Sequence, residues 1–160
     1  MLEINSIQDL TNLIEELKRR GDYSGAHNIL EQTIAYLEDR PCPDERIPPW
    51  YHEQLSIVLK KLGHKEEAIR VKQIYDEIVI RNFIIESKRI EKEPKYIRER
   101  YWPDGPVITK KVIESAKRLI KTNPALVKAA GLLDHNNNIV ASTPTQYDLD
   151  KLKKKRQNDG

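Results

Sequence analysis

The side chains that most often perform chemistry are few in this chain. It has four histidines (His27, His52, His64 and His135) and one cysteine, Cys42. None of the five stands at the sequence spacing of paired zinc ligands. Cys42 lies between two prolines, and the sequence shows no base or orienting group that would activate its thiol. We therefore expect no metal site and no nucleophilic cysteine.

Sites for phosphate binding and for acid–base catalysis are also missing from the sequence pattern. The chain contains no Gly-rich phosphate loop and no dinucleotide-binding fingerprint. Its carboxylate pairs, such as Glu15-Glu16 and Glu66-Glu67, are adjacent in sequence, so the two members of a pair do not share a helix face. No group of residues meets the geometric requirements of a catalytic site. The sequence therefore predicts a protein that is not an enzyme and that needs no cofactor.

Helical periodicity dominates the chain. Apolar residues recur at helical spacing, with Gly, Pro and Asn at the breaks, and they predict helices over residues 6–20, 23–39, 49–62, 65–92, 109–121, 124–133 and 145–156. Ser6 is expected to cap the first helix, and a capping box that begins at Thr145 is expected to start the last one. The chain has only six glycines, which disfavours Gly-rich β architectures. The predicted fold class is all-α.

Composition divides these helices into parts. We expect a helical domain over residues 1–92, a linker over residues 93–106, a basic helical hairpin over residues 107–142, and a short helix with a charged, frayed tail over residues 143–160. In residues 93–160 the 14 Lys and Arg exceed the 8 Asp and Glu by 6, whereas residues 1–92 carry 3 more acidic than basic residues. The basic C-terminal part is the candidate for an electrostatic role, unless its charge only keeps the surface solvated.

The sequence also bears on the cellular compartment. No run of apolar residues is long enough to cross a membrane. The first residues, Met1-Leu2-Glu3-Ile4-Asn5, lack the basic and apolar regions of a signal peptide. A single cysteine forms no intrachain disulfide. We expect a cytoplasmic protein without a membrane partner.

An internal repeat runs through the first half of the chain. A shift of 42 residues aligns Leu13 with Leu55, Leu17 with Leu59, Lys18 with Lys60, Gly21 with Gly63 and Ala26 with Ala68. Each copy is expected to consist of a helix, a tight Gly turn and a second helix. The small Ala that follows the Gly lets the two helices approach closely, so both alanines should be buried.

These segments resemble the tetratricopeptide-repeat (TPR) family. The segment Gly21-Asp22-Tyr23-Ser24-Gly25-Ala26 is similar to the family's Gly-x-Tyr-x-x-Ala core, and Leu62-Gly63-His64-Lys65-Glu66-Glu67-Ala68 resembles the same segment of a following repeat. Pro41 follows the second helix, where the family often has proline. The chain departs from the pattern in its period, which exceeds the family's ~34 residues, and at Ile14 and Ser56, which replace a family Gly. The resemblance covers residues 6–80; a generic antiparallel helical arrangement is the alternative.

The resemblance implies a helical stack that binds a protein or peptide in a groove lined by the first helix of each pair. The residues implied to contact the partner are Asn12, Glu15, Arg19, Trp50, Gln54, Ile57 and Lys61. Asn12 and Gln54 stand where some family members hold a partner's C-terminal carboxylate, and Trp50 is the candidate anchor. The predicted function is a non-catalytic interaction module, an adaptor or scaffold. Its partner is a segment of another protein or a second copy of the chain.

A nucleic-acid-binding accessory protein is the alternative function. The helices on either side of Thr122-Asn123-Pro124 could form a helix-turn-helix. Its phosphate contacts would come from Lys110, Lys117, Arg118, Lys121 and Lys128. The turn carries no Gly and the second helix has few polar residues that could read bases, so an ordinary basic hairpin accounts for the same pattern. The two functions differ in location: residues 6–62 for the adaptor and residues 107–156 for the nucleic-acid binder.

Overall fold

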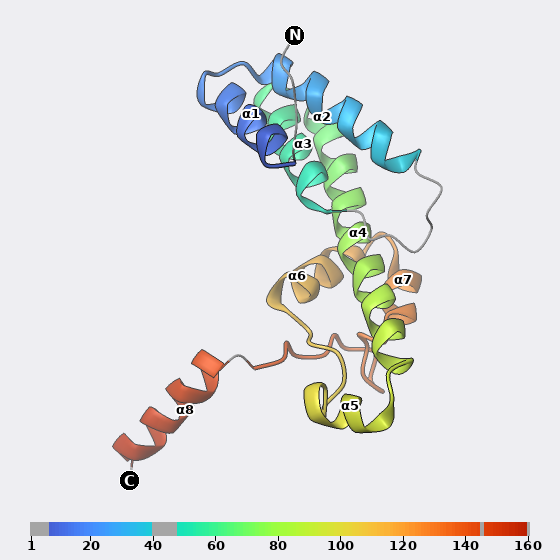
Figure 1. Cartoon of the computed structure of the whole chain (residues 1–160), viewed down its shortest axis with the longest axis vertical. Helices are drawn as coiled ribbons and strands as arrows, with labels where there is room; N and C mark the ends of the chain where they lie inside the picture. The colour runs from blue at the N-terminus through green and yellow to red at the C-terminus, as the bar shows by residue number, and fades with distance from the viewer. Residues whose placement is uncertain (1–6, 40–47, 145, 160) are drawn as a thin grey trace. The chain divides into compact units, whose positions relative to one another are not determined.

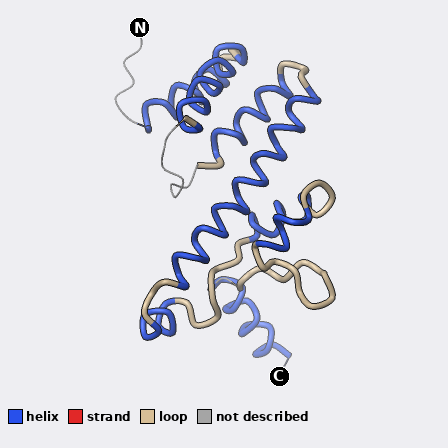
Figure 2. Tube along the Cα trace, turned by 90° about the vertical axis from the view of Figure 1, so that its right-hand side faces the viewer, coloured by secondary structure: helices blue, strands red, loops and turns tan. Residues whose placement is uncertain are grey.

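The structure is a computed structural model that describes residues 7–39, 48–144 and 146–159. The described residues form α1 (Ile7–Arg19), α2 (Tyr23–Glu38), α3 (Trp50–Lys61), α4 (Lys65–Glu91), α5 (Lys95–Tyr101), α6 (Lys110–Leu119), α7 (Pro124–Ala129) and α8 (Gln146–Asp159) (Figure 1). Figure 2 shows helices and loops and no strand in these residues, which confirms the all-α fold class. The expected cap at Ser6, the loop around Cys42 with Pro41, and Thr145 lie outside the described residues.

The chain divides into two compact units, and the division lies inside a helix. The first unit ends at Asn82 and the second begins at Phe83, so that α4 contributes to both. The sequence placed this boundary at residue 92, where the helical pattern ends. Residues 83–91 belong to the second unit, although they continue the same helix. None of the described helices is both long enough and apolar enough to span a membrane.

The first unit consists of two helical hairpins with the same turn. In the first turn, the Gly21 N–H donates to the carbonyl of Lys18 and the Asp22 N–H donates to the carbonyl of Leu17, at 3.0 and 2.9 Å. The second turn repeats both bonds 42 residues later, from Gly63 to Lys60 and from His64 to Leu59, at 3.1 and 2.9 Å. Both glycines have positive φ, +77° and +84°. This pair of bonds is the Schellman motif, which ends a helix with a left-handed residue and therefore favours Gly.

The hairpins of the first unit share one hydrophobic core. Its buried members are Ile14, Ala26, Leu30, Ile34, Tyr51, Leu55, Val58, Leu59, Ala68 and Val71. Ala26 is fully buried and Ala68 is 6% exposed, which confirms the expected burial of both small residues. Helix α2 packs against both α1 and α3. The core therefore joins side chains of both hairpins, and α3 covers part of the first one.

The second unit contains a helix where the sequence predicted a linker. Helix α5 occupies seven residues of the segment 93–106, so the expectation of an irregular linker is wrong there. Pro94 precedes the helix, and its carbonyl accepts hydrogen bonds from Ile97 and Arg98, both at 3.0 Å. A proline at this boundary costs no helical hydrogen bond, because the first N–H groups of a helix have no partner within it. Pro94 therefore starts a short helix here.

The basic hairpin of the second unit begins as the sequence predicts. The Thr109 side chain accepts a hydrogen bond from the Val112 N–H, and the Asn123 side chain accepts one from the Leu126 N–H. Pro124 is the first residue of α7, as expected. A loop follows, and its Thr143 holds Ile108 through two hydrogen bonds of 2.7 and 2.8 Å. The C-terminal segment, expected to fray, is helical through Asp159.

Candidate functional site

The residues implied to contact a partner lie on α1 and α3, and one of them joins these two helices. The Lys18 ammonium donates a hydrogen bond to Oε1 of Gln54. Gln54 is only 6% exposed. The amide of Gln54 is therefore engaged within the first unit. The TPR resemblance had implied that it lies on the surface and holds the C-terminal carboxylate of a partner.

The three implied residues of α1 interact mainly within their own helix. The Asn12 side chain accepts a hydrogen bond from Gln8, at 2.9 Å. Glu15 lies 3.7 Å from the Lys18 ammonium. Arg19 binds both oxygens of Glu16, at 2.7 and 2.6 Å, and these hydrogen bonds lower the pKa of Glu16. A partner that bound this side of α1 would compete with these local bonds.

Trp50 is half-buried and takes part in packing. It lies against the core of the first unit, and its ring meets that of Tyr51 edge-on with centroids 5.3 Å apart. An indole that already packs inside the protein has less surface left to offer a partner. Ile57 and Lys61, in contrast, are exposed. Of the implied residues on α3, these two therefore present the most surface to solvent.

A groove lies between α3 and the start of α4 and is lined by apolar and basic side chains. It encloses about 530 Å³ and is lined by Glu53, Ser56, Ile57, Lys60, Lys65, Ala68, Ile69 and Lys72. Ile57 is 39% and Ile69 is 69% exposed, which is unusual for two isoleucines that face one hollow. Lys60, Lys65 and Lys72 supply three ammonium groups, against the single carboxylate of Glu53. The groove suits an apolar surface flanked by acidic groups.

The groove lies on a face of the second hairpin, and α3 covers the corresponding face of the first hairpin. The shift of 42 residues places Ser56, Ala68 and Lys72 on Ile14, Ala26 and Leu30. These three residues of the first hairpin are completely buried in the core that they share with α3. On the second hairpin, Ala68 is still buried, but Ser56 and Lys72 are only half-buried, and all three line the groove. The sequence repeat shows that these positions are equivalent. It does not show on which of the two hairpins another helix covers them.

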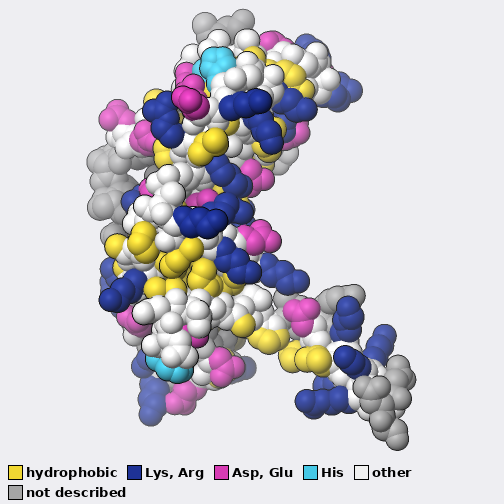
Figure 3. All heavy atoms as spheres, turned by 180° about the vertical axis from the view of Figure 1, so that it is seen from behind, with side chains coloured by type: hydrophobic (Ala, Val, Ile, Leu, Met, Phe, Trp, Pro, Cys, Tyr) yellow, Lys and Arg dark blue, Asp and Glu magenta, His cyan; other side chains and the backbone are white. Residues whose placement is uncertain are grey.

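The basic residues proposed for nucleic-acid binding lie on and around α6 and α7, and all are exposed. Lys110, Lys117 and Lys121 are spaced by seven and four residues, so they follow one line along α6 and its C-terminal end. The opposite face carries the buried Val112, Ala116 and Leu119. Glu114 lies on the basic side and reduces its charge. Lysines and arginine also crowd α8 (Figure 3).

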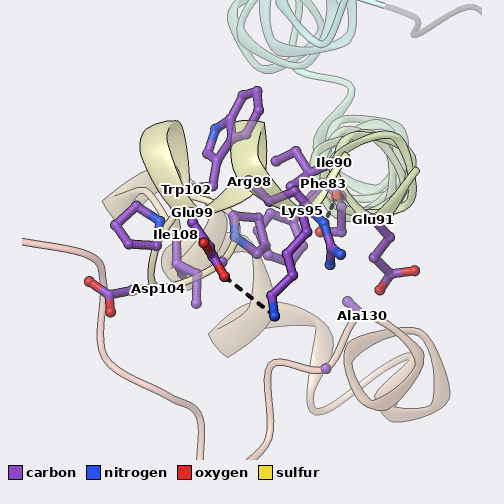
Figure 4. A pocket seen from close by; sticks show the side chains of 15 residues that line it. Phe83, Ile90, Glu91, Lys95, Arg98, Glu99, Trp102, Asp104, Ile108 and Ala130 are labelled. Atoms are coloured by element: carbon purple, nitrogen blue, oxygen red, sulfur yellow. Dashed lines mark hydrogen bonds and ion pairs between the residues drawn. The ribbon is translucent and has the colours of Figure 1, made fainter. Parts of the chain in front are cut away.

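A second hollow lies within the second unit and involves α5, which the sequence did not predict. It encloses about 590 Å³ between the end of α4, α5 and the loop that follows it (Figure 4). Lys95 and Glu99, on its wall, form an ion pair of 3.8 Å. Arg98 lines it too, and its Nε is buried without a hydrogen-bond partner among the described residues. The volume is that of a small-molecule site, with both signs of charge on its walls.

One group of metal-ligating side chains comes together in the first unit. His27 and Glu31 on α2 and Glu67 on α4 bring one ligand atom each to within 4.8 Å of one another. The expectation of no metal site rested on pairs of His and Cys alone, and it did not consider carboxylates from a distant helix.

Comparisons with known proteins add no assignment to this geometry. A scan against protein-family models and searches of curated proteins and of solved structures found no match to this chain. The TPR resemblance therefore stays a prediction from the sequence.

Proposed function

We propose that the chain is a non-catalytic interaction module that binds an acidic amphipathic helix of another protein in the groove between α3 and α4. One observation carries the proposal. The first hairpin buries Ile14, Ala26 and Leu30 in a core shared with α3, whereas the equivalent residues of the second hairpin, Ser56, Ala68 and Lys72, line a groove. A partner helix on the second hairpin would occupy the place that α3 takes on the first. This role agrees with the TPR resemblance, in which hairpins stack on one another.

The charge around the groove selects the kind of helix. Lys60, Lys65 and Lys72 line the groove together with the exposed Ile57 and Ile69, and the Lys72 ammonium lies 4.2 Å from the centre of the Tyr75 ring. An apolar helix face with Glu or Asp at its margins would cover the isoleucines and place carboxylates near the ammonium groups. The chain's own α8 does not fit this description, because it carries five Lys and Arg between Lys151 and Arg156. The occupant is therefore sought outside the chain.

A designed peptide tests this proposal. Its apolar residues copy those that α3 buries, namely Tyr51, Leu55, Val58 and Leu59, and Glu occupies the positions beside them. Fluorescence anisotropy should show binding of this peptide and at least tenfold weaker binding of a version with Lys for Glu. Ile69→Asp should weaken binding at least tenfold. Ile74→Asp should not, because Ile74 is also exposed on α4 but does not line the groove.

Three results would contradict the proposal. Equal binding of the acidic and basic peptides would remove the role of the lysines that line the groove. Unchanged peptide binding by a folded Ile69→Asp variant would exclude the groove as the binding site. A chain that forms dimers in analytical ultracentrifugation, and loses them on Ile69→Asp, would assign the groove to a second copy of the chain.

A second candidate function, nucleic-acid binding, is favoured by the line of Lys110, Lys117 and Lys121 on α6. Three phosphate contacts would make log affinity fall with log salt with a slope of about −2.7 on duplex DNA. Sequence preference should be weak, because these lysines would contact phosphates. A salt titration with a fluorescent duplex checks both points. Binding that persists after Lys117→Glu and Lys121→Glu would exclude this face as its origin.

A further inference from the structure

We propose that His27, Glu31 and Glu67, together with His64, bind a divalent transition-metal ion, with Zn²⁺ as the best fit to their chemistry. The four residues come from both hairpins of the first unit: His27 and Glu31 from α2, His64 from the Gly turn, and Glu67 from the first turn of α4. The ion would therefore join the second helix of one hairpin to the second helix of the other. This inference is independent of the proposed peptide groove.

The spacing of the ligand atoms supports the site. His27 Nε2 lies 3.1 Å from Oε1 of Glu31. Zinc ligands at about 2.0–2.1 Å in a tetrahedron are separated from each other by about 3.3 Å. These two atoms thus already stand at the distance that one ion requires. Glu67 brings an oxygen to within 4.8 Å of both, and a rotamer change of an exposed carboxylate closes such a gap.

His64 offers a fourth ligand atom. Its Nδ1 lies 3.7 Å from Oε2 of Glu67. His64 stands outside the group of three atoms that lie within 4.8 Å of one another, so its side chain would rotate to complete the site. Two imidazole nitrogens and two carboxylate oxygens form a donor set that suits zinc better than Ca²⁺ or Mg²⁺, which take oxygen ligands. The set is not a purely acidic cluster, because half of its members are imidazoles.

The buried Nε2 atom of His27 also supports a metal site. Its Nε2 is buried and lies 3.1 Å from Oε1 of Glu31, but the two atoms do not meet hydrogen-bond geometry, and no other described residue bonds this nitrogen. Buried polar atoms in proteins nearly always have a partner. A metal ion would accept the lone pair of this nitrogen. The side chains of Glu31, His64 and Glu67 are 51%, 58% and 42% exposed, which leaves a path for the ion from solvent.

Isothermal titration with ZnCl₂ on the untagged, chelator-treated full chain tests the site. We expect one ion per chain with a micromolar or smaller Kd, and an increase in the Tm when zinc is present. His27→Gln and Glu67→Gln should each weaken binding at least tenfold. His135→Gln and Glu66→Gln are the matched controls, because they remove an exposed imidazole and an exposed carboxylate outside the cluster; both should bind as the parent does.

Circular dichroism separates loss of the site from loss of the fold. Glu31→Gln provides a third variant, since Glu31 is half-exposed and its amide form should leave the fold intact. The proposal fails if the parent binds zinc no more tightly than folded His27→Gln and Glu31→Gln variants. It also fails if His135→Gln lowers the affinity as much as His27→Gln does.

Discussion

Lys18 on α1 and Gln54 on α3 are joined by a side-chain hydrogen bond that links the first helices of the two hairpins. The Lys18 side chain is 20% exposed, and Glu15 lies 3.7 Å from its ammonium. The bond therefore satisfies a charged donor that is only partly hydrated. It also fixes the position of α3 against the first hairpin.

Gln54→Leu should lower the free energy of unfolding by about 1.5 kcal/mol, because a charged donor loses its buried acceptor. A double-mutant cycle with Lys18→Met should give a coupling energy of about 1 kcal/mol, measured by urea unfolding. Gln32→Leu is the control, since Gln32 is exposed on α2 and should change stability by less than about 0.5 kcal/mol. Zero coupling would mean that the bond contributes no stability.

Gly63→Ala should destabilise the protein through its backbone alone. Gly63 has a φ of +84°, and a Cβ at this position would meet no atom within 4 Å. The left-handed conformation costs an L-residue about 1–2 kcal/mol. Gly63→Asn should cost less, because Asn tolerates this conformation better. Thermal unfolding of both variants measures the difference, and equal Tm values for Ala and Asn would contradict the explanation.

Ala68→Leu should overpack the core of the first unit and cost about 1–3 kcal/mol. Ala68 is 6% exposed and belongs to the cluster that joins both hairpins. Ala35→Leu adds the same atoms at an exposed position of α2 and should leave the Tm almost unchanged. If Ala68→Leu melts like the parent, the alanine does not mark a close helix contact.

His52 should make stability fall between neutral and mildly acidic pH. Burial lowers the pKa of His52 below 6.5, and Glu38, 3.9 Å from its Nε2, offsets this only in part. The unfolded chain then takes up the proton at higher pH than the folded chain. The stability that the neutral, buried His52 contributes is therefore fully present above pH 6.5. It is lost as the pH falls through the pKa of His52 in the folded chain.

Urea unfolding at pH 7.5, 6.5 and 5.5 measures this dependence. His52→Gln should show a smaller loss of stability over this range than the parent. His135→Gln should keep the slope of the parent, because His135 is exposed. A parent-like slope in His52→Gln would assign the effect to other groups.

The four helices of the first unit could be predicted from the sequence to within one or two residues, because their apolar spacing and their glycines agree. The helix α5 could not, because Pro94, Pro103 and Gly105 mark both of its ends as breaks, and only seven residues between them are helical. A segment of that length carries too little periodicity to be distinguished from a loop.

The candidate sites depend on contacts that no local pattern contains. His27 and Glu31 are four residues apart and could have been read as a pair on one helix face. Glu67 completes the group only because α4 folds back beside α2. The groove is likewise a property of packing: the TPR resemblance implied Ile57 as a partner contact, but Ile69 has the residue type of a core, and the structure leaves it 69% exposed.

Helix α4 has a consequence for how this chain could be divided. It runs for 27 residues, a length of about 40 Å, and contains neither Gly nor Pro where one unit gives way to the other. Proteases cleave extended backbone, whereas the backbone at this boundary is helical. Cleavage there would first require local unwinding next to the buried Val79 and Ile80. A cut at this boundary would therefore break a helix to which both units contribute, so neither unit could be excised or exchanged there with its helices intact.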